Sequence, residues 1–240
     1  MGIVKGMICM LNKMKFFYLL LLFLFSPIIY ADNVQEHTKL WFNGNFSGPL
    51  SKQNENVKYL IETRFRLIDD PFVFDHLRLS AGLGYEFIPS ITGYAGFGYV
   101  MDESTRGVLT HEYRPFQLLK WKLYKSNHVT FSNNSLLEER KQIESSGWAF
   151  RLREKFTVAI PMPIYDCEKY SLEFSNEFFF NLNHPKWVAK QFYAENRAVI
   201  GLGTKVSKSM KLMIGYINQY QITSPINKLS NGLIISLDVN

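Results

Sequence analysis

The sequence contains very little cysteine: only Cys9 and Cys167 occur among its 240 residues. Cys9 falls in a segment that we interpret below as a cleavable leader. Cys167 would then stand alone, so no disulfide could form within the remaining chain. A single cysteine is typical of an envelope protein that does not depend on disulfides.

Long apolar runs are also absent once the first 31 residues are set aside. No run of about 18 apolar residues remains, which excludes transmembrane helices, and no later segment keeps a 3.6-residue apolar period. If the mature protein spans a membrane, it must do so as a closed β-barrel, because only closure satisfies every backbone polar group in lipid.

Signatures of catalysis and metal binding are missing as well. The sequence has no Gly-x-Ser-x-Gly and no His-x-Ser motif, and its histidines and cysteines lack the spacing of metal ligands. Four of the five histidines lie at expected strand ends or turns, where we expect them to be exposed to solvent. His111 and Glu112 are neighbours on a strand and point to opposite faces. We therefore predict no catalytic residues, no metal and no cofactor.

The amino-terminal segment has the pattern of a Sec signal peptide. Lys13 and Lys15 form a basic start, residues 16–25 are apolar, and small residues precede a cleavage site after Ala31. Met14 is an alternative initiator. Removing residues 1–31 takes away three lysines and no acids, so the formal charge falls from +6 to +3. This weak charge gives no reason to expect a nucleic-acid partner. We expect residues 32–240 to form a single domain.

Residues 77–87, LRLSAGLGYEF, alternate between an apolar and a polar side chain at every position. This alternation predicts a β-strand with one apolar and one polar face. A strand of this length is long for a globular protein, where about 5–6 residues are usual, and matches the roughly 9–11 residues that a tilted strand needs to cross a bilayer. We interpret the polar face as lining the lumen of a barrel and the apolar face as meeting lipid.

Similar alternation, less regular in places, marks ten further segments. The fold class that we predict is therefore all-β: a transmembrane, antiparallel, up-and-down β-barrel. Bacterial single-chain barrels have an even number of strands, so we expect ten to twelve strands and favour twelve over the eleven segments that the pattern gives. The segments are residues 37–46, 57–67, 77–87, 91–101, 108–118, 128–140, 148–160, 170–182, 192–203, 210–220 and 229–239.

Arginine and glutamate gather on the faces that this pattern turns inward. Eight of the nine arginines and seven glutamates fall there, so the net charge of these residues is nearly zero. Arginine binds carboxylates through two parallel hydrogen bonds and is favoured where ion pairs must be ordered. We expect a charge network that fills and narrows the lumen, with a polar pathway or an anion site as the sharper alternative. The predicted network comprises Glu62, Arg64, Arg66, Arg78, Glu86, Glu112, Arg114, Glu138, Arg140, Arg151, Arg153, Glu173, Glu177, Glu195 and Arg197.

Aromatic residues near the ends of the expected strands suit the boundary between lipid and water, where amphipathic rings are enriched. We predict that Trp121, Tyr124, Trp148 and Trp187 lie at this boundary.

Six short motifs follow one another along the chain after the leader. They are HEYR (111–114), LLEER (136–140), RLR (151–153), SNEFFFN (175–181), YAENR (193–197) and IGYINQ (214–219). In order and spacing they resemble the bacterial domain-of-unknown-function family 2490, and the resemblance covers most of the chain after the leader. It implies an outer-membrane β-barrel and supplies no substrate, cofactor or catalytic residues.

Together these patterns predict a bacterial outer-membrane protein with a structural role or a role in small-solute passage. Its expected partners are the lipid bilayer, the outer-membrane assembly machinery and a small solute or lipid. Two alternatives stay open: a lipid-modifying enzyme of the phospholipase kind, and a soluble periplasmic barrel that binds an apolar ligand. The missing motifs favour a non-enzymatic role over the enzymatic alternative.

Overall fold

The structure is a computed structural model, and it describes residues 34–69, 72–103, 107–164, 167–223 and 226–240. The predicted signal peptide and its cleavage site lie outside these residues. No helix in the described ranges is long and apolar enough to cross a membrane.

The described residues form eleven β-strands, one for each segment that the alternating pattern marks. Several strands extend past the predicted ends, because regular pairing continues beyond the strictly alternating part. The strands are β1 (Val34–Pro49), β2 (Val57–Ile68), β3 (Val73–Ile88), β4 (Ile91–Glu103), β5 (Leu109–Lys125), β6 (Thr130–Gln142), β7 (Ala149–Ile164), β8 (Cys167–Asn181), β9 (Tyr193–Lys205), β10 (Met210–Gln221) and β11 (Asn227–Val239).

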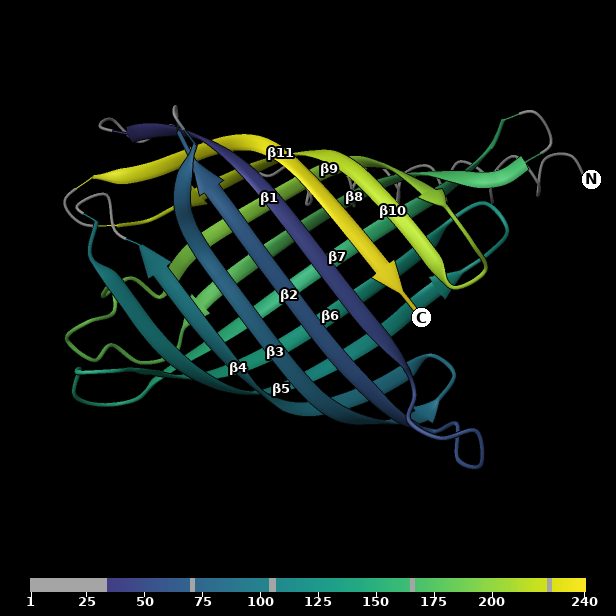
Figure 1. Cartoon of the computed structure of the whole chain (residues 1–240), viewed down its shortest axis with the longest axis horizontal. Helices are drawn as coiled ribbons and strands as arrows, with labels where there is room; N and C mark the ends of the chain where they lie inside the picture. Colours follow the sequence, from purple (N-terminus) through teal and green to yellow (C-terminus); the bar gives the residue numbers. More distant parts are fainter. Residues whose placement is uncertain (1–33, 70–71, 104–106, 165–166, 224–225) are drawn as a thin grey trace, which may run out of the picture.

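These strands close into one barrel in which each strand pairs with its neighbours in the chain (Figure 1). All consecutive strands run antiparallel, and the barrel is closed by a parallel pairing of β1 with β11. This seam extends from Val34 opposite Asn227 to Phe46 opposite Val239. We call the end of the barrel at Val34 the amino-terminal mouth and the end at Val239 the carboxy-terminal mouth.

The number of strands differs from the twelve that we favoured from the sequence. Among the described residues there are eleven strands, within the predicted range but not the favoured twelve. An odd number of up-and-down strands leaves the first and the last pointing the same way. The barrel can then close only through a parallel pair, so the expectation of purely antiparallel pairing fails at the seam between β1 and β11.

The barrel buries its charged face and exposes its apolar face. On β3, Arg78 is 3% exposed and lies inside, whereas Leu83 and Phe87 on the opposite face are 59% and 63% exposed. The same alternation recurs around the barrel, as in buried Arg197 and exposed Leu202 on β9. A soluble protein buries its apolar side chains instead, so the outer wall is built to face an apolar medium.

The interior also holds apolar side chains, which the alternating pattern did not predict. One buried apolar cluster contains Leu60, Tyr94, Phe116, Leu118 and Leu136. Its most deeply buried ring, Phe116, lies over two facing glycines, Gly82 and Gly96: a Cβ atom at Gly82 would come within 3.2 Å of Phe116 Cζ. The glycines of β3 and β4 therefore leave room for an aromatic ring inside the barrel.

A second buried cluster lies across the seam. It is formed by Trp41 of β1, Ile217 of β10 and Ile234 of β11, with Val199 and Met213 packed against it. Trp41 is almost fully buried. This cluster places an aromatic ring next to the charged residues described below.

Candidate functional site

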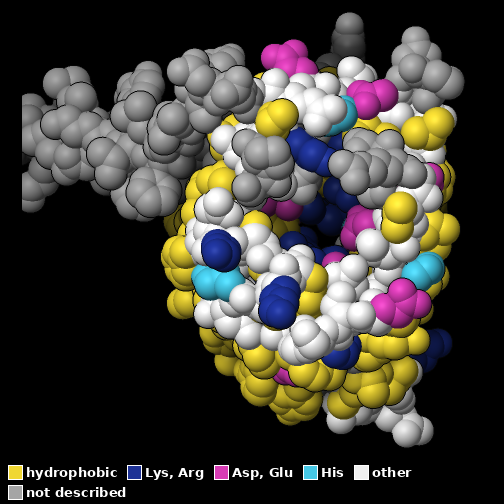
Figure 2. Space-filling view, turned by 90° about the vertical axis from the view of Figure 1, so that its left-hand side faces the viewer, with side chains coloured by type: hydrophobic (Ala, Val, Ile, Leu, Met, Phe, Trp, Pro, Cys, Tyr) yellow, Lys and Arg dark blue, Asp and Glu magenta, His cyan; other side chains and the backbone are white. Residues whose placement is uncertain are grey.

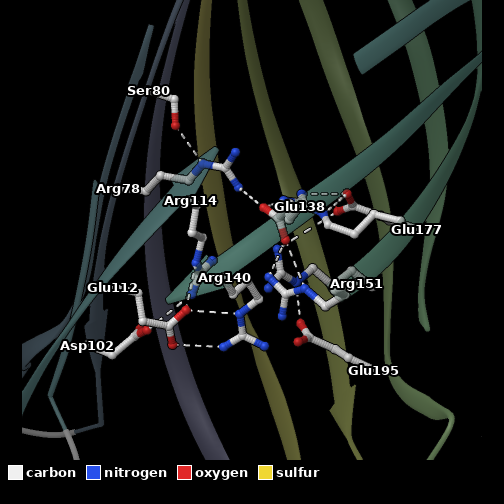
Figure 3. A network of polar contacts seen from close by, with 12 residues as sticks. Arg78, Ser80, Asp102, Glu112, Arg114, Glu138, Arg140, Arg151, Glu177 and Glu195 are labelled. Carbon is white, nitrogen blue, oxygen red and sulfur yellow. Dashed lines mark hydrogen bonds and ion pairs between the residues drawn. The ribbon is translucent and has the colours of Figure 1, made fainter. Parts of the chain in front are cut away.

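The most deeply buried carboxylate of the barrel is Glu138 on β6, which is 0% exposed. Its Oε1 atom accepts hydrogen bonds from Nη1 of Arg78 at 2.7 Å and from Nη1 of Arg153 at 2.8 Å. Its Oε2 atom accepts two from Arg151, at 2.6 Å and 2.8 Å. Figure 3 shows Glu138 at the centre of this network, with Arg78 of β3 and Arg151 of β7 on different sides. One carboxylate thus ties three guanidinium groups together.

The network continues from Glu138 across β8 and β9. Arg153 also donates two hydrogen bonds to Oε1 of Glu177, at 2.6 Å and 2.9 Å. Arg197 pairs with Glu195 and lies 3.8 Å from Glu177. Because each carboxylate is shared, the guanidinium groups are held in fixed positions across the barrel.

A second group of ion pairs centres on Glu112 of β5. Arg140 donates to both of its oxygens, at 2.8 Å and 2.9 Å, and Arg114 donates to Oε2 at 2.9 Å. Arg114 also approaches Asp102 at 3.8 Å, and Asp102 lies 3.4 Å from Arg66. This group lies closer to the amino-terminal mouth than Glu138 does, because it involves the first half of β5 and the end of β4.

Two aromatic rings lie between the arginines. The ring of Phe179, 0% exposed, has the guanidinium carbons of Arg151, Arg153 and Arg197 at 5.2, 4.8 and 4.4 Å from its centroid. Trp41 is flanked in the same way by Arg197 at 5.0 Å and by two arginines of β2. Aromatic faces attract cations, so these rings stabilise a cluster in which arginines would otherwise repel one another.

These residues lie midway along the barrel, with a chamber on each side. We call Glu138, Phe179, Trp41 and the arginines around them the septum. The chamber at the carboxy-terminal mouth has a volume of about 380 Å³ and the one at the amino-terminal mouth about 390 Å³; the two share no lining residue. Figure 2, which looks into the amino-terminal mouth, shows a hollow lined by basic and acidic side chains.

Eleven of the fifteen predicted network residues belong to these two groups of ion pairs. The other four lie towards the carboxy-terminal mouth, where each has another environment. Glu86 pairs with Lys58 at 3.3 Å, Glu173 pairs with Lys211, and Glu62 comes no closer than 4.0 Å to Arg78. Arg64 donates to the side chain of Asn43 at 3.2 Å.

Three of the predicted boundary aromatics are exposed on the barrel: Trp121, Tyr124 and Trp148. Trp121 and Tyr124 lie within β5, which continues seven residues past the predicted end. Trp187 differs. It lies in the connection between β8 and β9, with the guanidinium carbon of Arg140 at 5.2 Å from its ring centroid. It therefore contacts the charged interior of the amino-terminal mouth.

Two histidines also differ from expectation, since His37 and His76 are buried rather than exposed. His37 Nδ1 lies 2.6 Å from Asp69, and His76 Nδ1 lies 2.5 Å from Asp102. In the described part of the chain, the Nε2 atoms of both have no hydrogen-bond partner. Neither histidine is therefore bonded to a serine or cysteine nucleophile, although Ser230 is the register partner of His37.

Sequence reasoning missed Trp41, Phe179, Lys39, Asp75 and Asp102 because it followed arginine and glutamate alone. The alternation of faces along each strand could have found the two rings, because Phe179 points to the same face of β8 as Glu177. Asp75 could not have been found in this way. A register shift after Arg66 leaves Asp75 without a ladder partner, and its carboxylate lies 3.1 Å from Arg66 and 3.3 Å from Lys39.

The fold and the buried charges define a closed β-barrel with a charged interior and an apolar outer wall. A family model described as "Protein of unknown function (DUF2490)" matches residues 38–229, so the chain belongs to this family, as its motifs predicted. An uncharacterised protein of Methylorubrum extorquens is 30% identical over 189 residues, which are 79% of this chain and 80% of that protein. Among solved structures, a NanC porin is similar, with a TM-score of 0.49 at 10% identity over 82% of this chain and 98% of that chain.

Proposed function

We propose that this protein is a β-barrel of the bacterial outer membrane whose lumen is a small-solute passage, held closed midway by the septum. The observation that carries the proposal is the buried, fully paired Glu138 between two chambers that open at opposite mouths.

The outer wall supports the membrane location. All eleven described strands have 12 to 17 residues, more than the roughly 9–11 that span a bilayer. Exposed aromatic residues occur at both ends: Tyr85, Phe87 and Trp121 towards the carboxy-terminal mouth, and Tyr113 and Trp148 towards the other. Such girdles are typical of barrels at the two surfaces of a membrane.

This arrangement favours the membrane barrel over the two alternatives. A soluble barrel for an apolar ligand would need an apolar lumen, whereas both chambers here are lined mainly by polar and charged groups. A lipid-hydrolysing enzyme would need a nucleophile bonded to a base, and within the described residues neither His37 nor His76 has one.

The membrane location predicts a barrel that resists SDS until it is heated. The protein is expected to fractionate with outer membranes and, after extraction in detergent, to migrate faster on a gel when unboiled than when boiled. The reason is that a closed ladder of hydrogen bonds in an apolar medium has no edge from which it can unfold easily. Identical migration in both states, together with recovery in the periplasm, would contradict the proposal.

The septum predicts that removal of its central ring opens the passage. In planar bilayers the wild-type barrel is expected to conduct weakly, and Phe179→Ala to raise the single-channel conductance several-fold, because it removes a fully buried side chain between the chambers. Phe178→Ala is the matched control, since this neighbouring ring points to the other face of β8.

Heat-dependent migration of both variants shows whether they have folded. If a folded Phe179→Ala barrel conducts no better than Phe178→Ala, the result would contradict solute passage and favour a structural role. A wild-type barrel with the conductance of an open pore would show that the septum does not close the lumen.

A further inference from the structure

We propose that the chamber at the amino-terminal mouth binds small, water-borne anions that carry carboxylate or phosphate groups. This inference deepens the proposed function and rests on it, because it assigns the class of solute that enters the passage.

The charge of the chamber wall is the first observation. Five arginines and two lysines line it, against two aspartates and two glutamates. Glu112 and Glu138 lie behind this wall and neutralise part of its excess positive charge. Glu138 also pairs with arginines that line the other chamber. The chamber therefore remains positive, and a narrow space enclosed by protein of low dielectric constant strengthens the attraction for an anion.

The balance of hydrogen-bond donors is the second observation. Each guanidinium has five N–H donors and no acceptor, whereas the chamber's carboxylates are largely occupied. Asp75 contacts Lys39 and Arg66, and Asp102 contacts Arg66, His76 and Arg114. A ligand rich in acceptors supplies what the wall lacks, and carboxylate and phosphate oxygens match the geometry of arginine.

Groups without partners are the third observation. Arg197 lines the chamber and is nine-tenths buried; its Nη1 atom has no hydrogen-bond partner in the described residues and lies 3.8 Å from Glu177 of the other chamber. Lys228 also lines the chamber, at the start of β11, and forms no ion pair with any described residue. A cation without an ion pair to any described residue thus lies near the mouth, and the buried guanidinium of Arg197 lies deeper; this arrangement of positive charge guides an anion inward.

The size of the chamber limits the ligand. Its volume of about 390 Å³ falls at the lower end of the range for small-molecule sites, roughly 300–1,000 Å³. Because Glu138 and Phe179 close the barrel beyond it, the anion is held on one side of the septum until the septum moves. The chamber therefore acts as the first binding site of the passage.

Titration calorimetry of the whole protein in a non-ionic detergent tests the inference. Inorganic phosphate and citrate are the anionic probes, and glucose is the neutral one. We expect saturable binding of both anions, weaker binding at higher salt because ions screen the attraction, and no binding of glucose. Lys228→Gln is expected to weaken citrate binding by about tenfold, the loss of one charged contact.

Lys58→Gln is the matched control, because it removes the same charge at the opposite mouth, where Lys58 pairs with Glu86. It is expected to bind citrate as the wild type does. The inference is overturned if neither anion binds, if glucose binds as well as citrate, or if Lys58→Gln weakens binding as much as Lys228→Gln. Binding in detergent needs no passage. Anion binding without conductance in the Phe179→Ala barrel would thus overturn the proposed passage alone, and conductance without anion binding would overturn this inference alone.

Discussion

Glu138→Ala is expected to lower the free energy of unfolding by about 3–5 kcal/mol, which is the usual cost of removing one partner from a buried ion pair. The substitution leaves Arg78, Arg151 and Arg153 close together, with Arg78 and Arg151 deprived of their shortest ion pair. Unfolding in urea, followed by tryptophan fluorescence in detergent micelles, measures the change.

Glu139→Ala provides the control for this experiment. Glu139 is the next residue of β6, points to the opposite face, and accepts a hydrogen bond from Gln117 at 3.2 Å. Its loss is expected to cost less than about 1 kcal/mol, as is usual for an exposed polar pair. If Glu138→Ala and Glu139→Ala destabilise the barrel equally, then Glu138 does not hold the septum together.

Arg197→Ala is expected to cost less than Glu138→Ala, because its partners keep other donors. Glu195 still accepts from Gln219 at 2.5 Å and from Gln221 at 3.3 Å, and Glu177 still accepts from Arg153. A carboxylate with remaining hydrogen bonds is penalised less than an unpaired one. The effect of a substitution in the septum therefore depends on how many donors each carboxylate shares.

Gly232→Ala is expected to prevent the barrel from closing. Gly232 lies opposite Lys39 in the parallel seam, and a Cβ atom there would overlap the carbonyl oxygen of Lys39. A backbone atom cannot move aside without losing ladder hydrogen bonds, so β1 and β11 could not keep their register. The measurement is the fraction of protein that shows heat-dependent migration, which we expect to fall by at least about tenfold, since a loss of about 1.4 kcal/mol already has that effect.

Gly48→Ala is the control for the seam. A Cβ atom there meets only the ring of Tyr59, at 3.2 Å, and a side chain can move away. This variant is expected to fold as the wild type does. Wild-type folding of Gly232→Ala would mean that β1 and β11 do not pair at this register.

The alternating pattern predicted the strands well because it is set by the most basic property of the fold, the separation of two faces along each strand. All eleven marked segments are strands. Twelve strands were favoured because a rule about other barrels was preferred to the pattern itself; the described residues form eleven, within the predicted range. A parallel seam follows from eleven up-and-down strands, but nothing in a single strand reports the register at which β1 and β11 pair, so this register could not be predicted.

The site was predicted less completely, since contact across a lumen depends on register and strand tilt rather than on sequence position. The alternation of faces placed Arg78, Glu138 and Arg153 on inner faces, but it could not show that the Glu138 carboxylate joins both arginines. The pairing of Asp75 depends on a register shift, and the contact of Trp187 with Arg140 depends on the path of a long connection. Neither leaves a periodic signal.

The odd strand number also fixes where fusions to the two ends of the barrel would emerge. Because β1 and β11 point the same way, the start of β1 and the end of β11 lie at opposite mouths (Figure 1). In a barrel that spans the outer membrane, an epitope inserted directly before Val34 and another attached after Val239 would be displayed on different sides of the bilayer. Only one of them could then be reached by antibody on intact cells.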